Sequence, residues 1–150
     1  SGTYRLDVGG LPEGMYVQSA RLGSDDVLQN GLNASGGGVL EITIAAGAAE
    51  LQGTVTNADG QPSGGALVVV VPKNESPYRE LKRSAVADQT GAFRLAGLVP
   101  GEYRLFAWED IEAGAWLDPD FRKNYEAASK SIELKENGRE IVQIRVISSN

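Results

Sequence analysis

Histidine and cysteine are both absent from the 150 residues of this sequence. Without histidine the chain cannot build Ser-His-Asp or Cys-His machinery, and it lacks the commonest general base near neutral pH. Without cysteine it has no disulfide, no thiolate nucleophile and no zinc–thiolate site. The remaining catalytic options are carboxylate pairs, lysine or tyrosine chemistry, and metal ions held by oxygen ligands.

Long apolar runs and basic stripes are missing as well. The longest clean apolar run, residues 66–71, is far shorter than the roughly 20 residues of a membrane-spanning helix. The formal net charge of -6 repels phosphate backbones and anionic lipid surfaces. Apolar residues nevertheless make up 41% of the chain, which is enough for a packed core. We therefore expect a folded, monomeric protein that neither binds nucleic acid nor inserts into a membrane.

The pattern of the chain predicts an all-β protein. Short runs with period two or with β-branched residues alternate with segments rich in glycine and polar residues. These runs predict strands at residues 3–8, 16–22, 39–44, 49–56, 65–72, 83–87, 92–95, 101–108, 131–134 and 139–147. One helical turn is expected within residues 121–129. The glycine run at residues 35–38 is interpreted as a connector, because no Lys-Ser/Thr pair follows it as in a phosphate-binding loop.

Three segments carry turn chemistry, at residues 57–60, 88–91 and 136–138. Each combines polar residues with a glycine that can adopt the positive φ of a tight turn, and we expect each to form a hairpin. Residues 68–71 are apolar on both faces, as in a central strand. The expected core lies between two sheets and consists of Val68, Val70, Phe93, Leu95, Tyr103, Leu105, Ile144 and Val146.

The two ends of the chain resemble each other. Tyr4-Arg5-Leu6 recurs as Tyr103-Arg104-Leu105, and an apolar strand follows later in each half. The spacing between the copies is about the length of one sandwich domain. We interpret residues 1–47 as the C-terminal part of a preceding β-sandwich repeat and residues 48–150 as a complete domain.

Three motifs in the second part resemble the carboxypeptidase regulatory-like domain, a transthyretin-like fold. They are the opening strand and turn at residues 51–66, the turn and aromatic strand at residues 88–95, and the Pro-Gly-Glu-Tyr strand entry at residues 98–105. The resemblance implies a Greek-key, Ig-like β-sandwich. Residues 105–110 with 114–116 are similar to a variant in large secreted, periplasmic or outer-membrane-associated bacterial proteins, acidobacterial ones especially. The resemblance to the carboxypeptidase regulatory-like domain also implies a non-catalytic module without a cofactor. Its partners are then other domains of the same polypeptide.

The aromatic residues after residue 105 are the candidate binding site. Phe106 and Trp108 alternate with core residues and should point out of the sandwich, next to a long connection that contains further rings. In one interpretation this connection folds back and caps the two rings as a satellite core. In the other, the rings form a platform for a polysaccharide or peptide, with carboxylates as acceptors. The candidate ligand-binding residues are Trp108, Trp116, Phe121, Tyr125, Glu109 and Asp110.

Two further chemistries remain open from the sequence. The acidic residues Glu109, Asp110, Glu112, Asp118 and Asp120 could bind calcium through oxygen ligands, although they lack EF-hand spacing. A carboxylate-based hydrolase would need two acids facing each other in a cleft, and no pair stands out. We expect no catalytic residue and no dedicated metal site, and a role as spacer, folding support or protein-contact domain.

Overall fold

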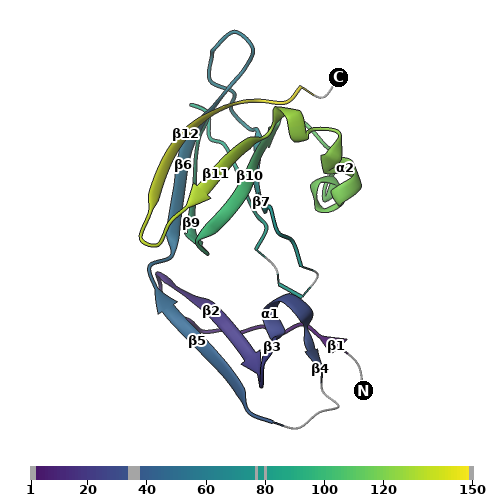
Figure 1. Cartoon of the computed structure of the whole chain (residues 1–150). Coiled ribbons are helices and arrows are strands. Elements are labelled where there is room, and N and C mark those ends of the chain that lie inside the picture. The colour runs from purple at the N-terminus through teal and green to yellow at the C-terminus, as the bar shows by residue number, and fades with distance from the viewer. Residues whose placement is uncertain (1–2, 34–37, 77, 80, 149–150) are drawn as a thin grey trace.

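The computed structural model describes residues 3–33, 38–76, 78–79 and 81–148. Figure 1 shows a smaller N-terminal part, purple to blue, below a larger β-sandwich formed by the rest of the chain. The N and C marks lie at opposite ends of the molecule (Figure 1). None of the described helices has the length and apolar character needed to cross a lipid bilayer.

One sheet of the sandwich has four antiparallel strands in the order β11-β10-β7-β8. Their bounds are Lys130–Leu134 for β11, Gly101–Trp108 for β10, Leu67–Pro72 for β7 and Arg83–Val86 for β8. The two inner strands pair from Tyr103 opposite Pro72 to Trp108 opposite Leu67. The expected central strand is therefore confirmed.

The second sheet has three strands in the order β12-β6-β9. Their bounds are Arg139–Arg145 for β12, Ala49–Thr56 for β6 and Ala92–Leu98 for β9. β12 runs parallel to β6, and β9 runs antiparallel to it. The predicted all-β, Greek-key transthyretin-like sandwich is confirmed, and the predicted strands 49–56 and 101–108 have the bounds observed for β6 and β10.

The main core lies between these two sheets. Seven of the eight predicted core residues are buried there, and Val146 packs against them partly exposed. Burial of each large apolar side chain stabilises the fold by about 1.5–3 kcal/mol. On β12 the alternation has the predicted direction, because Ile144 is buried whereas its neighbour Arg145 is exposed.

The three turn segments reverse the chain as predicted, and an antiparallel bridge between Thr56 and Pro62 closes the first of them as a short hairpin. None of the three joins two strands of the same sheet, so the predicted hairpins between the long strands are wrong. Residues 57–60 lead from β6 to β7, residues 88–91 from β8 to β9, and residues 136–138 from β11 to β12. In each case the two strands belong to different sheets. Turn chemistry fixes the positive φ, 81° at Gly60 and 58° at Asn137, whereas burial of the apolar faces decides which strands pair.

The N-terminal part has its own small sheets and its own apolar cluster. The sheet β3-β2-β5 consists of Asp25–Asp26, Met15–Leu22 and Leu40–Ala46, and the pair β1-β4 consists of Thr3–Tyr4 and Leu32–Asn33. A short helix that the pattern did not predict, α1 at Val27–Asn30, begins at Asp26, whose carboxylate accepts from the N–H groups of Leu28 and Gln29. Its cluster centres on Ala20, Val27 and Leu28.

The matching Tyr-Arg-Leu segments occupy different structural positions. Tyr103 lies in an eight-residue inner strand and is 1% exposed. Tyr4 lies in a two-residue strand and is 54% exposed, and the predicted strand at residues 3–8 is reduced to β1. The short sequence match therefore does not mark equivalent strands. Of the glycine connector at residues 35–38, only Gly38 lies within the described residues.

Gly53 in β6 provides a test of the core packing. A Cβ at this position would collide with the main-chain oxygen of Val142 and would lie 2.8 Å from the ring of Phe93. We expect Gly53→Ala to lower the free energy of unfolding by about 1–3 kcal/mol, because the crowded atoms must shift. Urea denaturation measures this change.

The matched control is Gly9→Ala, since a Cβ on Gly9 meets nothing within 4 Å. Its effect should stay within about 0.5 kcal/mol. Equal stability losses in the two variants would contradict the packing of β6 against β12 and β9.

Candidate functional site

The connection between β10 and β11 forms a cap on the outer face of the four-stranded sheet. It contains a 3₁₀ turn η1 at Ala115–Leu117, helix α2 at Pro119–Lys123 and a second 3₁₀ turn η2 at Glu126–Ala128. Figure 1 shows α2, in light green, beside the sandwich at the level of β10. Asp118 begins α2 by accepting from the N–H of Asp120 at 2.9 Å, and Pro119 occupies the first turn. The expected helical turn thus begins two residues earlier than predicted.

The aromatic rings form a packed cluster beneath this cap. Phe106 and Trp108 are each 1% exposed and stack with ring centroids 5.0 Å apart. Tyr125 meets Trp108 edge-on at 5.7 Å, and Phe121 lies 5.8 Å from it. Trp116 packs against the same cluster and is partly exposed. This geometry is that of a satellite core, and we call these five rings, together with Val69 and Val71 of β7, the cap cluster.

A hollow of about 270 Å³ lies at one side of the cap cluster. Trp108, Phe121 and Tyr125 line it, together with Asp110 and Glu112. Two other candidate residues, Trp116 and Glu109, do not line it. The indole N–H of Trp108 is buried and has no hydrogen-bond acceptor among the described residues. The structure thus brings four of the six candidate residues together, and their role in ligand binding stays a prediction.

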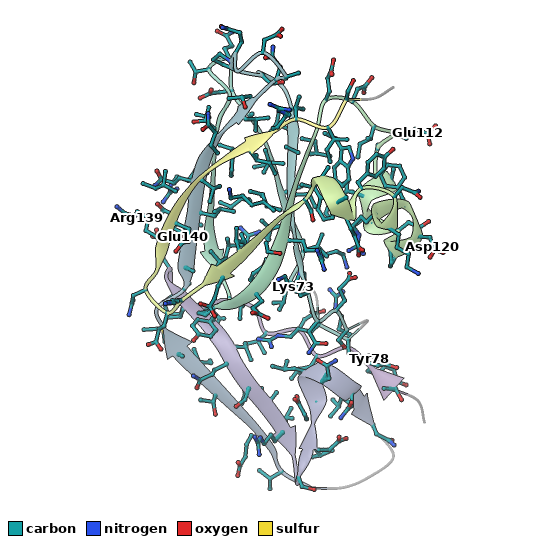
Figure 2. All side chains as sticks on the ribbon, turned by 45° about the horizontal axis from the view of Figure 1, so that its top comes forward. Lys73, Tyr78, Glu112, Asp120, Arg139 and Glu140 are labelled. Atoms are coloured by element: carbon teal, nitrogen blue, oxygen red, sulfur yellow. The ribbon has the colours of Figure 1, made fainter. Side chains whose placement is uncertain are left out.

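The acidic residues of the cap do not converge. Among the described residues no three acidic side chains lie close enough to hold a metal ion. Figure 2 shows Glu112 and Asp120 far apart on the cap, with both side chains directed away from the sheet. The carboxylate of Asp118 serves as the helix cap described above.

An ion pair between the buried Arg122 and the more exposed Glu75 fastens the cap to the loop that follows β7. Arg122 is 5% exposed and donates to both carboxylate oxygens of Glu75, at 2.8 and 3.1 Å. Lys82 lies 3.7 Å from the same carboxylate. No sequence pattern predicts this contact, because the two partners are 47 residues apart and each lies in a polar segment.

Among the described residues three titratable groups have displaced pKa values, and each serves the fold. Hydrogen bonds from Gln52 and Arg94 lower the pKa of Glu50 at the start of β6. Hydrogen bonds from Thr90 and from the N–H of Ala92 lower the pKa of Asp88. Burial raises the pKa of Tyr103 to about 12, and its hydroxyl donates to the main-chain oxygen of Val99 at 2.6 Å. A carboxylate in a tight turn, another in a strand network and a protonated phenol do not form an acid–base pair.

Among the described residues, hydrogen bonds connect the N-terminal part and the sandwich at two places, which we call the join. In the β7–β8 loop, Ser76 donates to the main-chain oxygen of Gln29 at 2.8 Å, and Arg79 donates to that of Val17 at 2.9 Å. At the linker, the N–H groups of Gly47 and Ala48 both donate to the main-chain oxygen of Gly14.

The linker is also held from the sandwich side. The N–H of Asn137, in the turn before β12, donates to the main-chain oxygen of Gly47 at 2.8 Å. Figure 2 shows Tyr78, from the β7–β8 loop, beside the N-terminal part. A Cβ on Gly31 would lie 2.8 Å from the Tyr78 ring, and Gly31 has a φ of 83°. Glycine is therefore required at this contact for two reasons.

Residues 50–116 match the family model of the carboxypeptidase regulatory-like domain. This part of the sandwich is similar to that family, and we call the sandwich the regulatory-like domain below. The matched region runs from β6 through β10 to the start of the cap, so it contains the inner strands of both sheets. The resemblance inferred from the three motifs is thereby confirmed.

Three solved structures illustrate the relation of this regulatory-like domain to known folds. The TIE protein of Bacillus anthracis is 18% identical with a TM-score of 0.45, covering 71% of this chain and 19% of its own. A DUF3823 family protein from Parabacteroides merdae is 23% identical with a TM-score of 0.45, covering 68% and 47%. BcpA, the major pilin subunit of Bacillus cereus, is 13% identical with a TM-score of 0.42, covering 75% and 34%.

The present chain spans less than half of the length of each of these three structures. A sequence search of curated proteins found no match.

The ion pair between Arg122 and Glu75 gives a test of the cap. We expect Glu75→Gln to lower the free energy of unfolding by about 2–3 kcal/mol, because it leaves a buried guanidinium without its counter-charge. The expected loss of stability is smaller than that for a fully buried ion pair, because the Glu75 side chain is 33% exposed. Chemical denaturation followed by tryptophan fluorescence measures it.

Glu126→Gln is the matched control, since the exposed Glu126 carboxylate lies within ion-pair distance of no described residue. Its effect should be near zero. Arg122→Met should also retain more stability than Glu75→Gln, because it removes the buried charge instead of isolating it. The reverse order of the two variants would refute this role of the pair.

Proposed function

We propose that the chain is a non-catalytic module of a larger exported protein. In this proposal the regulatory-like domain holds the part that precedes it in one orientation and offers its surface to other domains or proteins. The join carries this proposal. Two attachment points on opposite sides of an interface resist rotation, whereas a linker alone would leave the parts free to move.

The chemistry of the join supports a mechanical role. Ser76 is 8% exposed and its hydroxyl also accepts from the N–H of Tyr78 at 3.1 Å, so the loop conformation and the contact are coupled. Two hollows of about 240 Å³ each adjoin Arg79 and Leu81 between the parts. The orientation therefore depends on a few directed hydrogen bonds more than on a continuous apolar interface.

The division of the chain belongs to the same proposal. We assign residues 48–150 to the regulatory-like domain and residues 1–47 to the C-terminal part of a preceding β unit. The small sheet of residues 3–46 leaves Ile42 and Ile44 38% and 41% exposed, as expected of a sheet that lacks part of its cover. Export to the cell envelope or beyond rests on the sequence resemblance of residues 105–116 to modules of such proteins.

Loss of the loop contacts tests the mechanical role. We expect the double variant Ser76→Ala, Arg79→Ala to let the N-terminal part move relative to the sandwich. Backbone ¹⁵N relaxation should give one rotational correlation time for both parts of the unmodified protein and two distinct values in the variant. Thermal stability of the sandwich should change little, since its core is untouched.

Arg83→Ala is the matched control, because Arg83 donates to the main-chain oxygen of Ala96 within the sandwich. It should leave a single correlation time. Independent tumbling of the two parts in the unmodified protein would rule out the spacer role.

A second candidate function is carbohydrate binding in the hollow beside the cap cluster. One observation favours it: aromatic rings and the carboxylates of Asp110 and Glu112 line the same space. Sugars combine apolar C–H faces with hydroxyl donors, so they fit a site of rings and acceptors. A carboxylate-based hydrolase is not favoured by any such observation.

A glycan array tests this candidate. We expect the double variant Asp110→Asn, Glu112→Gln to lose at least about 10-fold in affinity for any sugar that binds, because buried hydroxyls would lose charged acceptors. Asp120→Asn, on the far side of the cap, is the control and should bind as the unmodified protein does. Absence of sugar binding in the unmodified protein would exclude the candidate and leave the spacer proposal intact.

A further inference from the structure

A second hollow lies beneath the cap, between helix α2, the loop after β7 and the outer face of the four-stranded sheet. Its volume is about 170 Å³. The apolar floor comes from Val71 and Phe106, which belong to the cap cluster. The strand alternation places Arg104 on this face, since its neighbours Tyr103 and Leu105 point into the main core.

The lining of this hollow is basic. Lys73, Arg104, Arg122 and Lys123 line it, against the two carboxylates of Glu75 and Glu126. The lining therefore carries a net charge of +2 in a chain whose formal net charge is -6. Positive side chains have been brought together at one place although the chain has few of them. Figure 2 shows Lys73 in the region between the sandwich and the N-terminal part.

Three of the four cations form no ion pair with any residue that the structure describes. Glu75 is engaged by Arg122 and Lys82. No carboxylate among the described residues lies within ion-pair distance of Lys73, Arg104 or Lys123. Arg104 is half-buried, opposite Val71 on the neighbouring strand, and so loses part of its hydration. Like charges gathered at a partly dry site repel each other, and a bound anion removes that repulsion.

Arg122 provides a separate sign of an incomplete site. It is 5% exposed and its Nε–H group has no hydrogen-bond acceptor among the described residues. Buried donors of this kind are nearly always satisfied in folded proteins. This N–H donor belongs to Arg122, which lines the hollow and also forms the ion pair with Glu75.

We propose that this hollow binds a single oxyanion group, a carboxylate or a phosphate or sulfate ester, of an anionic ligand. The guanidinium of Arg104 supplies the planar donor fork that suits such groups, and Lys73 and Lys123 supply flanking charge. The acidic remainder of the chain disfavours a polyanion such as nucleic acid, because only one small region attracts it. The site is independent of the spacer role and of the hollow at the other side of the cap cluster.

Titrations followed by ¹⁵N–¹H NMR test the proposal, with inorganic phosphate, sulfate and glucuronate as three separate probes at constant ionic strength. At least one probe should cause saturable shifts confined to amides near residues 71–73, 104–106 and 119–123. Arg104→Gln should weaken this binding about 10-fold, the loss expected for a charge-assisted hydrogen bond. The same spectra show whether the variant is folded.

Arg145→Gln is the matched control, because Arg145 is an exposed arginine without an ion-pair partner among the described residues, on the other sheet. It should bind the probe unchanged. Saturation by glucuronate alone identifies a sugar carboxylate as the ligand group, and saturation by phosphate or sulfate alone identifies an ester or the free ion. Shifts that do not saturate with any probe, or equal weakening by Arg104→Gln and Arg145→Gln, would overturn the site.

Discussion

The pairing of β7 with β10 is the interaction on which the rest of the molecule depends. These two strands lie in the middle of their sheet, and residues 68–71 and 105–108 are buried on both faces. One face supplies Val68, Val70 and Leu105 to the main core. The other supplies Val69, Phe106 and Trp108 to the cap cluster. A sheet with two apolar faces must be covered on both. The apolar residues on the outer face of β10 therefore require the long connection that follows β10 and packs over them.

The sequence predicted the local conformation better than the connectivity. Period-two patterns and β-branched runs identified the sandwich strands, because strand formation depends on neighbours one or two residues away. The turns at residues 57–60, 88–91 and 136–138 were located for the same reason, but each crosses between sheets. A tight turn needs the same positive φ in a hairpin and in an arch, so glycine and asparagine cannot distinguish them. Helix α1 was not predicted, because its four residues are too few to show a helical period.

The candidate site shows the same limit at the level of side chains. The outward alternation of Phe106 and Trp108 was readable from β10, and it led to the rings that lie over them. Whether a ring covers its neighbours or faces solvent depends on the path of the cap, which the ion pair between Arg122 and Glu75 fixes. Trp116 packs against the cluster without reaching the hollow that Trp108 lines. The basic hollow was equally unpredictable, since its cations come from three separate segments of the chain.

At the join, the two parts contribute different kinds of hydrogen-bonding group. At the β7–β8 loop the side-chain donors, Ser76 and Arg79, belong to the regulatory-like domain. The N-terminal part contributes main-chain oxygens of Gln29 and Val17, and at the linker the acceptor is again a main-chain oxygen, that of Gly14. Every residue type offers such an oxygen, so these hydrogen bonds depend on the backbone path of the N-terminal part and not on its side chains. A domain that holds its neighbour in this way tolerates sequence change in that neighbour, provided that Gly31 keeps its close approach to Tyr78.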